Sequence, residues 1–371
     1  MIVALLLSSC MSEEGGPVVQ SALKIYVFTP DRPIVTRADE GNVLSTGTEG
    51  NVNTMQIWVF KHSDGTLVGY LAPTADELVG LNGSQQATYL MRIPDWFYQA
   101  KPNVDVYVVA NTTASNCGLT LDKNTTRAQL DAALIAHSTT DYFGITANTT
   151  SVPTDGLPMS GVLKNQKVEG EAPVLRVGDG GLASVKLVRA VSKIRFVASQ
   201  NAAAEKKLKI KSITLDANVM PTQEYLFLTG AYTERSYHVG STLEPATELW
   251  SDATLVIKEC EDAATYTFIT GTAQEYETQI NQGITNNEVS ELASYYWRES
   301  DKKLTGTITY QLGTDAEKTA TFEMSEAGDF SRNHTWIVYA YHTGADQLKL
   351  ISVFVTPWNT QAVVEPEVYN W

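Results

Sequence analysis

The amino-acid sequence predicts an all-β protein with two antiparallel β-sandwich domains in tandem and few short helices. Short segments that alternate apolar and polar side chains recur along the whole chain, as expected of strands with one buried face. Turn-forming sequences such as Ser63-Asp64-Gly65 and Leu81-Asn82-Gly83 separate these segments. Segments with helical spacing are almost absent, which excludes the alternating strands and helices of a nucleotide-binding fold.

The first predicted strand covers residues 23–27, where Leu23, Ile25 and Val27 share one face that would be buried. The other strands predicted in the first half cover residues 55–60, 67–71, 88–93 and 104–110. Those predicted in the second half cover residues 183–188, 193–198, 207–215, 225–228, 253–257, 265–269, 303–312, 318–324, 334–341 and 348–355. In the first half one short helix is predicted, over residues 126–135, because Leu130, Leu134 and Ile135 recur at helical spacing.

Length and charge limit the classes of function. A chain of 371 residues fits two domains, and the glycine-rich segment 178–181 predicts a boundary that gives domains 38–182 and 183–371. No internal apolar run approaches the roughly 20 residues of a membrane-spanning helix. The net charge of -15 argues against nucleic acid as a partner, because phosphate binding requires a surface rich in Lys and Arg.

The amino terminus is expected to be processing sequence. An apolar run ends in Leu7-Ser8-Ser9-Cys10, and polar residues and glycines follow, which resembles a lipobox. Residues 1–10 would then be the signal segment of a lipoprotein, and Cys10 would carry the lipid (palmitate) anchor. The positively charged residues that normally open such a segment are missing, which points to a true start upstream of Met1.

A polar loop is predicted between the first strand and residue 55. It contains Arg37 followed by Ala38, and an exposed loop that carries an arginine is a good protease substrate. Arg32 is a rival site, but Pro33 follows it, and proline prevents the backbone pairing that trypsin-like cleavage needs. Cleavage is therefore expected after Arg37, which makes residues 11–37 a propeptide.

No catalytic or metal-binding motif is found. HExxH, GxSxG and the glycine-rich phosphate loops are absent, so we expect no enzyme, no cofactor and no metal. The histidines are scattered without neighbouring ligands; they are His62, His137, His238, His334 and His342. The acidic run from Glu259 to Asp262 is interpreted as a solvated turn, since consecutive strand residues point to opposite faces.

Two features leave alternatives open. Cys117 and Cys260 could form a disulfide or could be buried thiols, and buried thiols are favoured. The aromatic run Tyr295-Tyr296-Trp297 could stack on a sugar, which would make the protein a monomeric surface lipoprotein that binds carbohydrate. A place for these rings in the core is favoured, as is usual for aromatic residues in β proteins.

The order of these features resembles the fimbrial subunits of Bacteroidetes type V pili, the FimA-type fimbrillin family. The residues that carry the resemblance span nearly the whole chain and cover residues 55–60 (MQIWVF), 157–161 (LPMSG), 187–194 (LVRAVSKI), 332–334 (RNH) and 353–358 (VFVTPW). The resemblance implies transthyretin-like sandwich domains and a structural role in adhesive fimbriae on the cell surface.

The resemblance also implies a route of assembly. The precursor would be anchored in the outer membrane, cut by an arginine-specific protease at Arg37, and lose the strand that contains Leu23, Ile25 and Val27. Another pilus subunit would fill the vacated groove with a strand from its carboxyl-terminal region, either residues 348–355 or the tail 362–371. Pro366 weakens the case for the tail.

Overall fold

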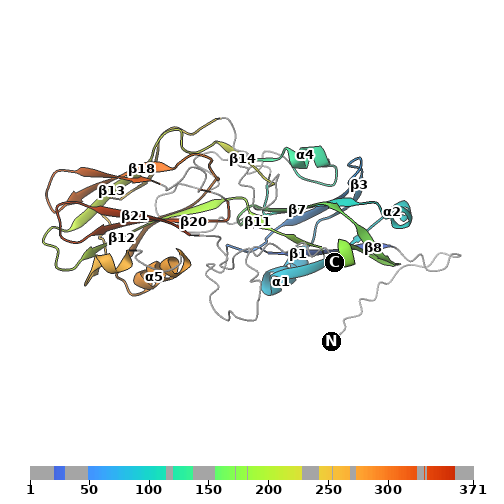
Figure 1. Cartoon of the computed structure of the whole chain (residues 1–371), viewed down its shortest axis with the longest axis horizontal. Coiled ribbons are helices and arrows are strands. Elements are labelled where there is room, and N and C mark those ends of the chain that lie inside the picture. Colours follow the sequence, from blue (N-terminus) through green and yellow to red (C-terminus); the bar gives the residue numbers. More distant parts are fainter. Residues whose placement is uncertain are drawn as a thin grey trace.

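The computed structural model describes residues 21–29, 49–113, 120–136, 155–171, 173–181, 183–227, 242–252, 254–267, 273–323, 330 and 332–355, without the side chains of 273, 274 and 351–355. The predicted all-β sandwich class is confirmed, since four sheets of four or five strands dominate the described residues. Figure 1 shows the two halves of the chain end to end along the longest axis. Within the described ranges, no helix has the length and hydropathy of a membrane span.

The first half is a sandwich of two five-stranded sheets. One sheet contains β1 (Ala22–Phe28), β4 (Gln86–Arg92), β8 (Val168–Glu171), β9 (Val174–Val177) and β10 (Ser184–Lys186). The other has the order β11 (Val188–Arg189), β7 (Met159–Gln166), β5 (Val104–Ala110), β2 (Met55–Lys61) and β3 (Leu67–Leu71). Apolar side chains from both sheets, such as Ile25 and Val106, form one core between them.

The second half is also a sandwich. One sheet contains β12 (Ser192–Asn201), β16 (Glu259–Cys260), β17 (Ser290–Trp297), β20 (Thr335–His342) and β21 (Lys349–Val355). The facing sheet has the order β15 (Thr247–Ser251), β13 (Leu208–Leu215), β18 (Thr305–Leu312) and β19 (Lys318–Glu323). Helix α5 (Ala273–Thr285) covers the outer face of β12 and β20 through Tyr276 and Ile280, so β12 is buried on both faces.

Neither sandwich is purely antiparallel. Strand β1 runs parallel to β9 and β10, and β12 runs parallel to β20 and β16. Parallel neighbours need long connections between them, and alternation of side chains along a strand carries no information about direction. The sequence pattern therefore predicted the strands without these pairings.

Several local predictions were wrong. The segment predicted as a helix over 126–135 contains only one helical turn and a half, α4 (Arg127–Asp131), before the chain becomes strand β6 (Leu134–Ala136). The turn predicted at residues 81–83 lies inside α1 (Ala75–Ser84), which Thr74 and Glu77 begin with a capping box. Gly80 and Gly83 made a turn the expected structure at this position, because glycine disfavours helical structure.

Other differences concern helix α5, which was not predicted, and several short elements. Helix α2 (Asp95–Ala100) was not predicted. Residues 254–257 form no strand, and part of the strand predicted at 265–269 is a 3-10 helix, η2 (Ala263–Tyr266). A further 3-10 turn, η1 (Asp179–Gly181), lies in the segment where the domain boundary was predicted. Strands β10 and β11 follow that segment and pair with sheets of the first half, so the change between the sandwiches lies between β11 and β12.

Candidate functional site

Strand β1 is an inner strand of its sheet. All seven of its residues pair antiparallel with β4, from Ala22 opposite Arg92 to Phe28 opposite Gln86. Its other edge pairs with β9 and then with β10, at residues 22–24 and 26–28. Both edges of this strand are therefore satisfied by neighbours from distant parts of the chain.

The side chains of β1 alternate as predicted. Leu23, Ile25 and Val27 are at most 1% exposed and lie in the core of the first half. Burial of three such side chains contributes about 5–9 kcal/mol, at about 1.5–3 kcal/mol for each one. The intervening Lys24 and Tyr26 are half-buried, with the Lys24 ammonium 5.0 Å from the centre of the Tyr26 ring.

Removal of β1 would leave a groove. Among the described strands, β4 pairs with β1 alone, so its seven residues would lose every ladder partner. Strands β9 and β10 would lose their partners on the same side of the sheet. The result would be an apolar slot lined on both sides by unpaired backbone N–H and C=O groups, which is the kind of site that binds an added strand.

The two ends of the predicted loop are fixed. At its upstream end, Thr29 N donates to Gln85 O at 3.1 Å and Leu187 N donates to Phe28 O at 2.9 Å. At its downstream end Glu49 and Val52 are 1% exposed. Residues 49–53 form neither helix nor strand, as predicted for this loop, but the side chains of Glu49 and Val52 are packed into the fold.

Glu49 lies where the two sandwiches meet. Its carboxylate accepts hydrogen bonds from Tyr296 and from Lys193 Nζ, the latter at 2.5 Å, and both donors belong to the second half. Its backbone oxygen accepts from Arg189 Nε at 3.0 Å. Burial alone would raise the pKa of Glu49, but Lys193 and Arg189 outweigh burial and hold that pKa below its usual value, so the group is ionised.

Asn111 holds the chain between Glu49 and β2. Its side-chain oxygen accepts from Asn53 N at 2.8 Å, and its amide donates to Asn51 O at 2.8 Å and to Leu157 O at 2.9 Å. The residue is fully buried with a φ of 57°, a conformation that asparagine tolerates better than most residues. Asn111 begins an N-x-[ST] sequence, but its burial leaves no room for a glycan.

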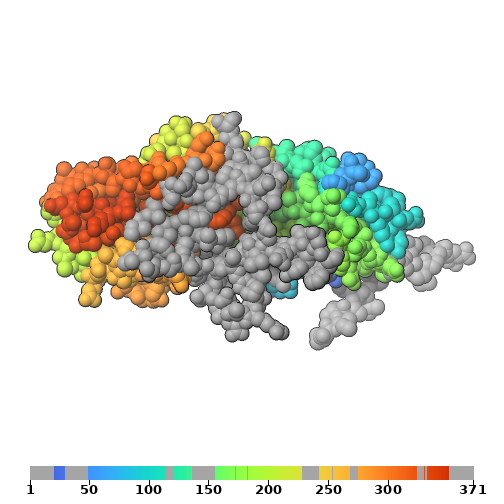
Figure 2. All heavy atoms as spheres, viewed as in Figure 1, coloured from blue at the N-terminus to red at the C-terminus, as the bar shows by residue number. Residues whose placement is uncertain are grey.

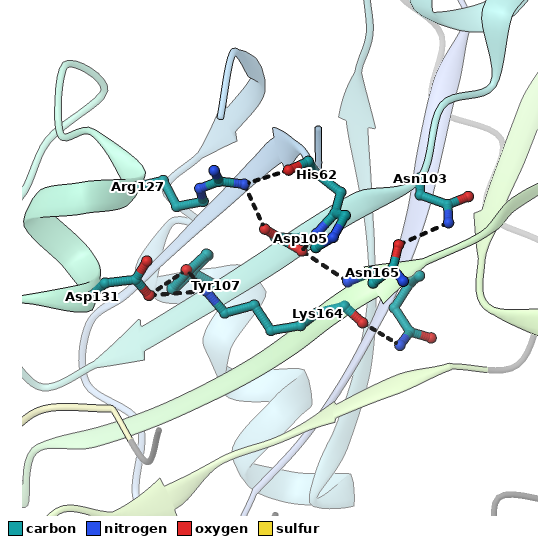
Figure 3. A network of polar contacts seen from close by, with 9 residues as sticks. His62, Asn103, Asp105, Tyr107, Arg127, Asp131, Lys164 and Asn165 are labelled. Carbon is teal, nitrogen blue, oxygen red and sulfur yellow. Dashed lines mark hydrogen bonds and ion pairs between the residues drawn. The ribbon is translucent and has the colours of Figure 1, made fainter. Parts of the chain in front are cut away.

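A polar network lies on the outer face of the β2–β5–β7 sheet (Figure 3). Asp105 accepts from Arg127 at 2.9 Å and from Asn165 N at 2.8 Å, and it lies 2.7 Å from His62 Nδ1. Burial would raise the pKa of Asp105, but these hydrogen bonds hold it below its usual value. Asp105 is the one charged residue in the apolar strand Val104–Ala110. This sequence signal for a polar network was not recognised.

The second part of that network pins α4 to the sheet. Tyr107 donates to Asp131 Oδ1 at 2.6 Å, and Lys164 Nζ lies 2.9 Å from the same oxygen (Figure 3). Every charged group of the network is paired with another of its members. The arrangement is therefore structural and offers no group that is free to react with a substrate.

The remaining candidate residues do not form a site. Among the described residues, no group of three or more His, Cys, Asp or Glu side chains could hold a metal ion. Cys260 is a buried free thiol 3.6 Å from Ser199 Oγ, and burial raises its pKa. Cys117, His137 and His238 lie outside the described residues.

The aromatic run is part of the core. Tyr295, Tyr296 and Trp297 are 2–5% exposed in β17, and Tyr295 donates to the backbone oxygen of Leu249. Rings buried to this extent present no face to a sugar. The core interpretation is confirmed, and the carbohydrate platform suggested for these residues is not formed.

Comparison with known proteins identifies the first half. Residues 23–191 match the model of the major fimbrial subunit protein (FimA), from the first apolar residue of β1 to the end of the first sandwich. The match covers slightly less than half of the chain. The predicted resemblance is confirmed over these residues, and the matched family consists of structural components of cell-surface fimbriae, not of enzymes.

One solved structure shows the fold over more of the chain. A protein described as a cell-adhesion protein from Parabacteroides distasonis is 13% identical, with a TM-score of 0.55 over 91% of this chain and 98% of that one. A second such protein, from Bacteroides eggerthii, is 13% identical with a TM-score of 0.48 over 91% and 95%. The tip fimbrial protein Mfa3 from Porphyromonas gingivalis is 13% identical with a TM-score of 0.47 over 91% and 99%. No curated protein sequence matches the chain.

The structure places only some of the predicted processing residues. Leu23, Ile25 and Val27 lie in β1, as described above. Cys10, Arg37, Ala38 and the tail 362–371 lie outside the described residues. The residues that sequence reasoning missed are the buried charges where the sandwiches meet, such as Glu49 and Lys193.

Proposed function

We propose that the protein is a structural subunit of a cell-surface pilus that polymerises by strand exchange and contributes to adhesion. The observation that carries the proposal is the position of β1, which lies between β4 and the β9–β10 edge and directly precedes the segment that contains Arg37. A cut after Arg37 would leave β1 held by non-covalent contacts alone. A strand from another subunit could then replace it in the same ladder.

The proposal includes an earlier, membrane-bound stage. Cys10 would carry the lipid that anchors the precursor in the outer membrane, and the segment 11–37 would leave as the propeptide. The mature chain would begin at Ala38. Departure of β1 after cleavage would thus release the subunit from its anchor and open its groove.

The replacing strand must repeat the apolar pattern of β1. Residues 348–355 do so, because Ile351, Val353 and Val355 are spaced like Leu23, Ile25 and Val27. Strand β21 in this segment pairs with β20 alone among the described strands, so its release breaks one ladder. The tail 362–371 contains proline and repeats the pattern less well, which favours residues 348–355 as the donor.

The contacts in the groove can overcome repulsion between subunits. Each chain carries a net charge of -15, which disfavours association of identical subunits at low salt. Burial of three aliphatic side chains contributes about 5–9 kcal/mol. Each ladder hydrogen bond adds about 0.5–1.5 kcal/mol, so a single inserted strand gives a directional contact of useful strength.

The proposal is tested by digestion of the purified precursor with an arginine-specific protease. Mass spectrometry of the product should give a new amino terminus at Ala38, and electrophoresis after mild detergent treatment should show a ladder of oligomers. Arg37→Gln should block both results. Arg32→Gln is the matched control and should leave both unchanged.

Two outcomes would contradict separate parts of the proposal. Cleavage after Arg37 that leaves a monomer, even with time and added subunits, would exclude strand exchange. A cut at another arginine would exclude the processing site. The lipid anchor is tested independently, since Cys10→Ser should abolish incorporation of labelled palmitate by expressing cells.

A further inference from the structure

An arm of the second half reaches across to the first half. Residues 220–227 lead away from the second sandwich and the chain returns through residues 242–244, with Glu244 N donating to Met220 O at 2.7 Å and Thr222 N donating to Thr242 O at 2.9 Å. We call residues 220–227 the arm. It contains strand β14 (Gln223–Tyr225), which Figure 1 shows between the second sandwich and α4 of the first.

The backbone of the arm is bonded to the first half. Strand β14 pairs antiparallel with β6, from Gln223 opposite Ala136 to Tyr225 opposite Leu134. Leu226 N then donates to Ala133 O at 2.8 Å, and Leu226 O accepts from Ser160 Oγ at 2.5 Å. The arm thus makes a continuous series of hydrogen bonds with a sandwich to which it does not belong in sequence.

The tip of the arm completes an apolar cluster on the outer face of the β2–β5–β7 sheet. Leu226 is 0% exposed and Phe227 is 4% exposed. They pack in one cluster with first-half residues that include Trp58 and Tyr107, and the Phe227 and Tyr107 rings meet edge to face with centroids 5.1 Å apart. Large aromatic side chains on this face depend on the arm for part of their cover.

Buried arginines of the second half hold the arm and the chain that returns from it. Arg332 donates to Tyr225 O at 2.6 Å and to Leu226 O at 3.0 Å, while its guanidinium also pairs with Glu299. Arg298 pairs with Glu244 at 2.6 Å, where the returning chain meets the arm. The arm is therefore held to the first half by apolar packing and to the second half by hydrogen bonds from the buried Arg332.

We propose that the arm belongs to the core of the first half and joins the two sandwiches into one cooperative folding unit. The residues that match the fimbrial family, 23–191, do not by themselves cover the outer face of the β2–β5–β7 sheet. The second half supplies the missing part. This inference does not depend on the proposed strand exchange, because it concerns the uncut precursor.

The experiment compares hydrogen exchange in the full-length, uncut precursor and in Leu226→Ala with Phe227→Ala. We expect amides of β2, β5 and β6 to exchange at least about tenfold faster in the double variant, while those of β13 and β18 are unchanged. Calorimetry of the unmodified chain should show one unfolding transition, and the double variant should show two. Gln223→Ala, which changes a half-buried arm residue outside the apolar cluster, is the matched control.

A double variant that fails to fold would be replaced by Phe227→Leu, which keeps an apolar side chain in the cluster. This variant should show the same pattern with a smaller change. Unaltered exchange in β2, β5 and β6 would overturn the proposal, as would two separate transitions in the unmodified chain. Neither result would affect the proposal of cleavage at Arg37.

Discussion

Arg332 Nη2 lies 2.5 Å from Glu299 Oε1, and both side chains are only 4% exposed. Arg332→Met would leave Glu299 buried without its partner and would remove the arginine that donates to Tyr225 O and Leu226 O. We expect a loss of about 3–5 kcal/mol in the free energy of unfolding, as for other broken buried ion pairs. Urea denaturation measures this loss. Lys302→Met removes the exposed pair with Asp301 and should change stability by about 0–1 kcal/mol.

Glu224, in the arm, should make stability depend on pH. Burial raises the pKa of Glu224 from its ordinary value of 4.5 to about 8, although Arg332 lies nearby. Between about pH 4.5 and pH 8 the folded state therefore keeps a proton on Glu224 that the unfolded state has already released. The stability that this group contributes is present at low pH and is lost as the pH rises through that range. Glu224→Gln should flatten the decline, as measured by urea denaturation at a series of pH values. An equally steep decline in the variant would contradict this assignment.

The core position of β1 predicts a large effect of truncation. Ile25 is 1% exposed, so Ile25→Ala should destabilise the precursor by about 2–5 kcal/mol. Lys24→Ala changes the opposite face of the same strand and should cost far less. Thermal unfolding of the uncut protein compares the two variants. Similar shifts in Tm would show that the two faces of β1 contribute equally to stability, contrary to this prediction.

Asn111 combines two contributions that substitution can separate. Asn111→Ala removes its hydrogen bonds and places alanine at a φ of 57°, so we expect a loss of about 2–4 kcal/mol from the unpaired groups and the backbone together. Asn111→Gly removes the same hydrogen bonds but tolerates the backbone conformation. Glycine should therefore be the less destabilising of the two in urea denaturation. The reverse order would show that backbone strain is unimportant here.

Cys260 provides a test of packing and of disulfide formation. Its thiol is buried and its pKa is raised, so iodoacetamide should label it at least about tenfold more slowly in the native protein than after unfolding in denaturant. Peptide mapping by mass spectrometry distinguishes Cys260 from the other cysteines. A thiol that stays unlabelled after unfolding without reductant would instead reveal a disulfide.

Alternation of side chains predicted much of the fold. It located β2, β3 and β5 to within a residue, and it placed Leu23, Ile25 and Val27 on one buried face. It failed where other forces decide the structure. Helix α1 depends on a capping box and tertiary packing in spite of its glycines, and the parallel neighbours of β1 depend on contacts that no local pattern encodes.

The partners of the buried charges between the sandwiches could not be predicted from the sequence. Arg189 and Lys193 interrupt an apolar segment, but the sequence analysis did not recognise them as buried charges. Their partners Asn333 and Glu49 lie 144 residues away in each case, in opposite directions along the chain. Only the folded chain brings such groups together, because a buried charge is tolerated wherever any opposite charge or polar group reaches it.

The directions of the strands around β1 bear on the symmetry of any assembly built through this groove. A strand that takes the place of β1 and keeps its ladders must run antiparallel to β4 and parallel to β9 and β10. Every such junction then has the same orientation, with a donor on one subunit and an acceptor on the next, which is a heterologous contact. A fibre formed in this way would be polar, with one end that offers a groove and another that offers a strand, so the two ends would need different proteins to terminate them.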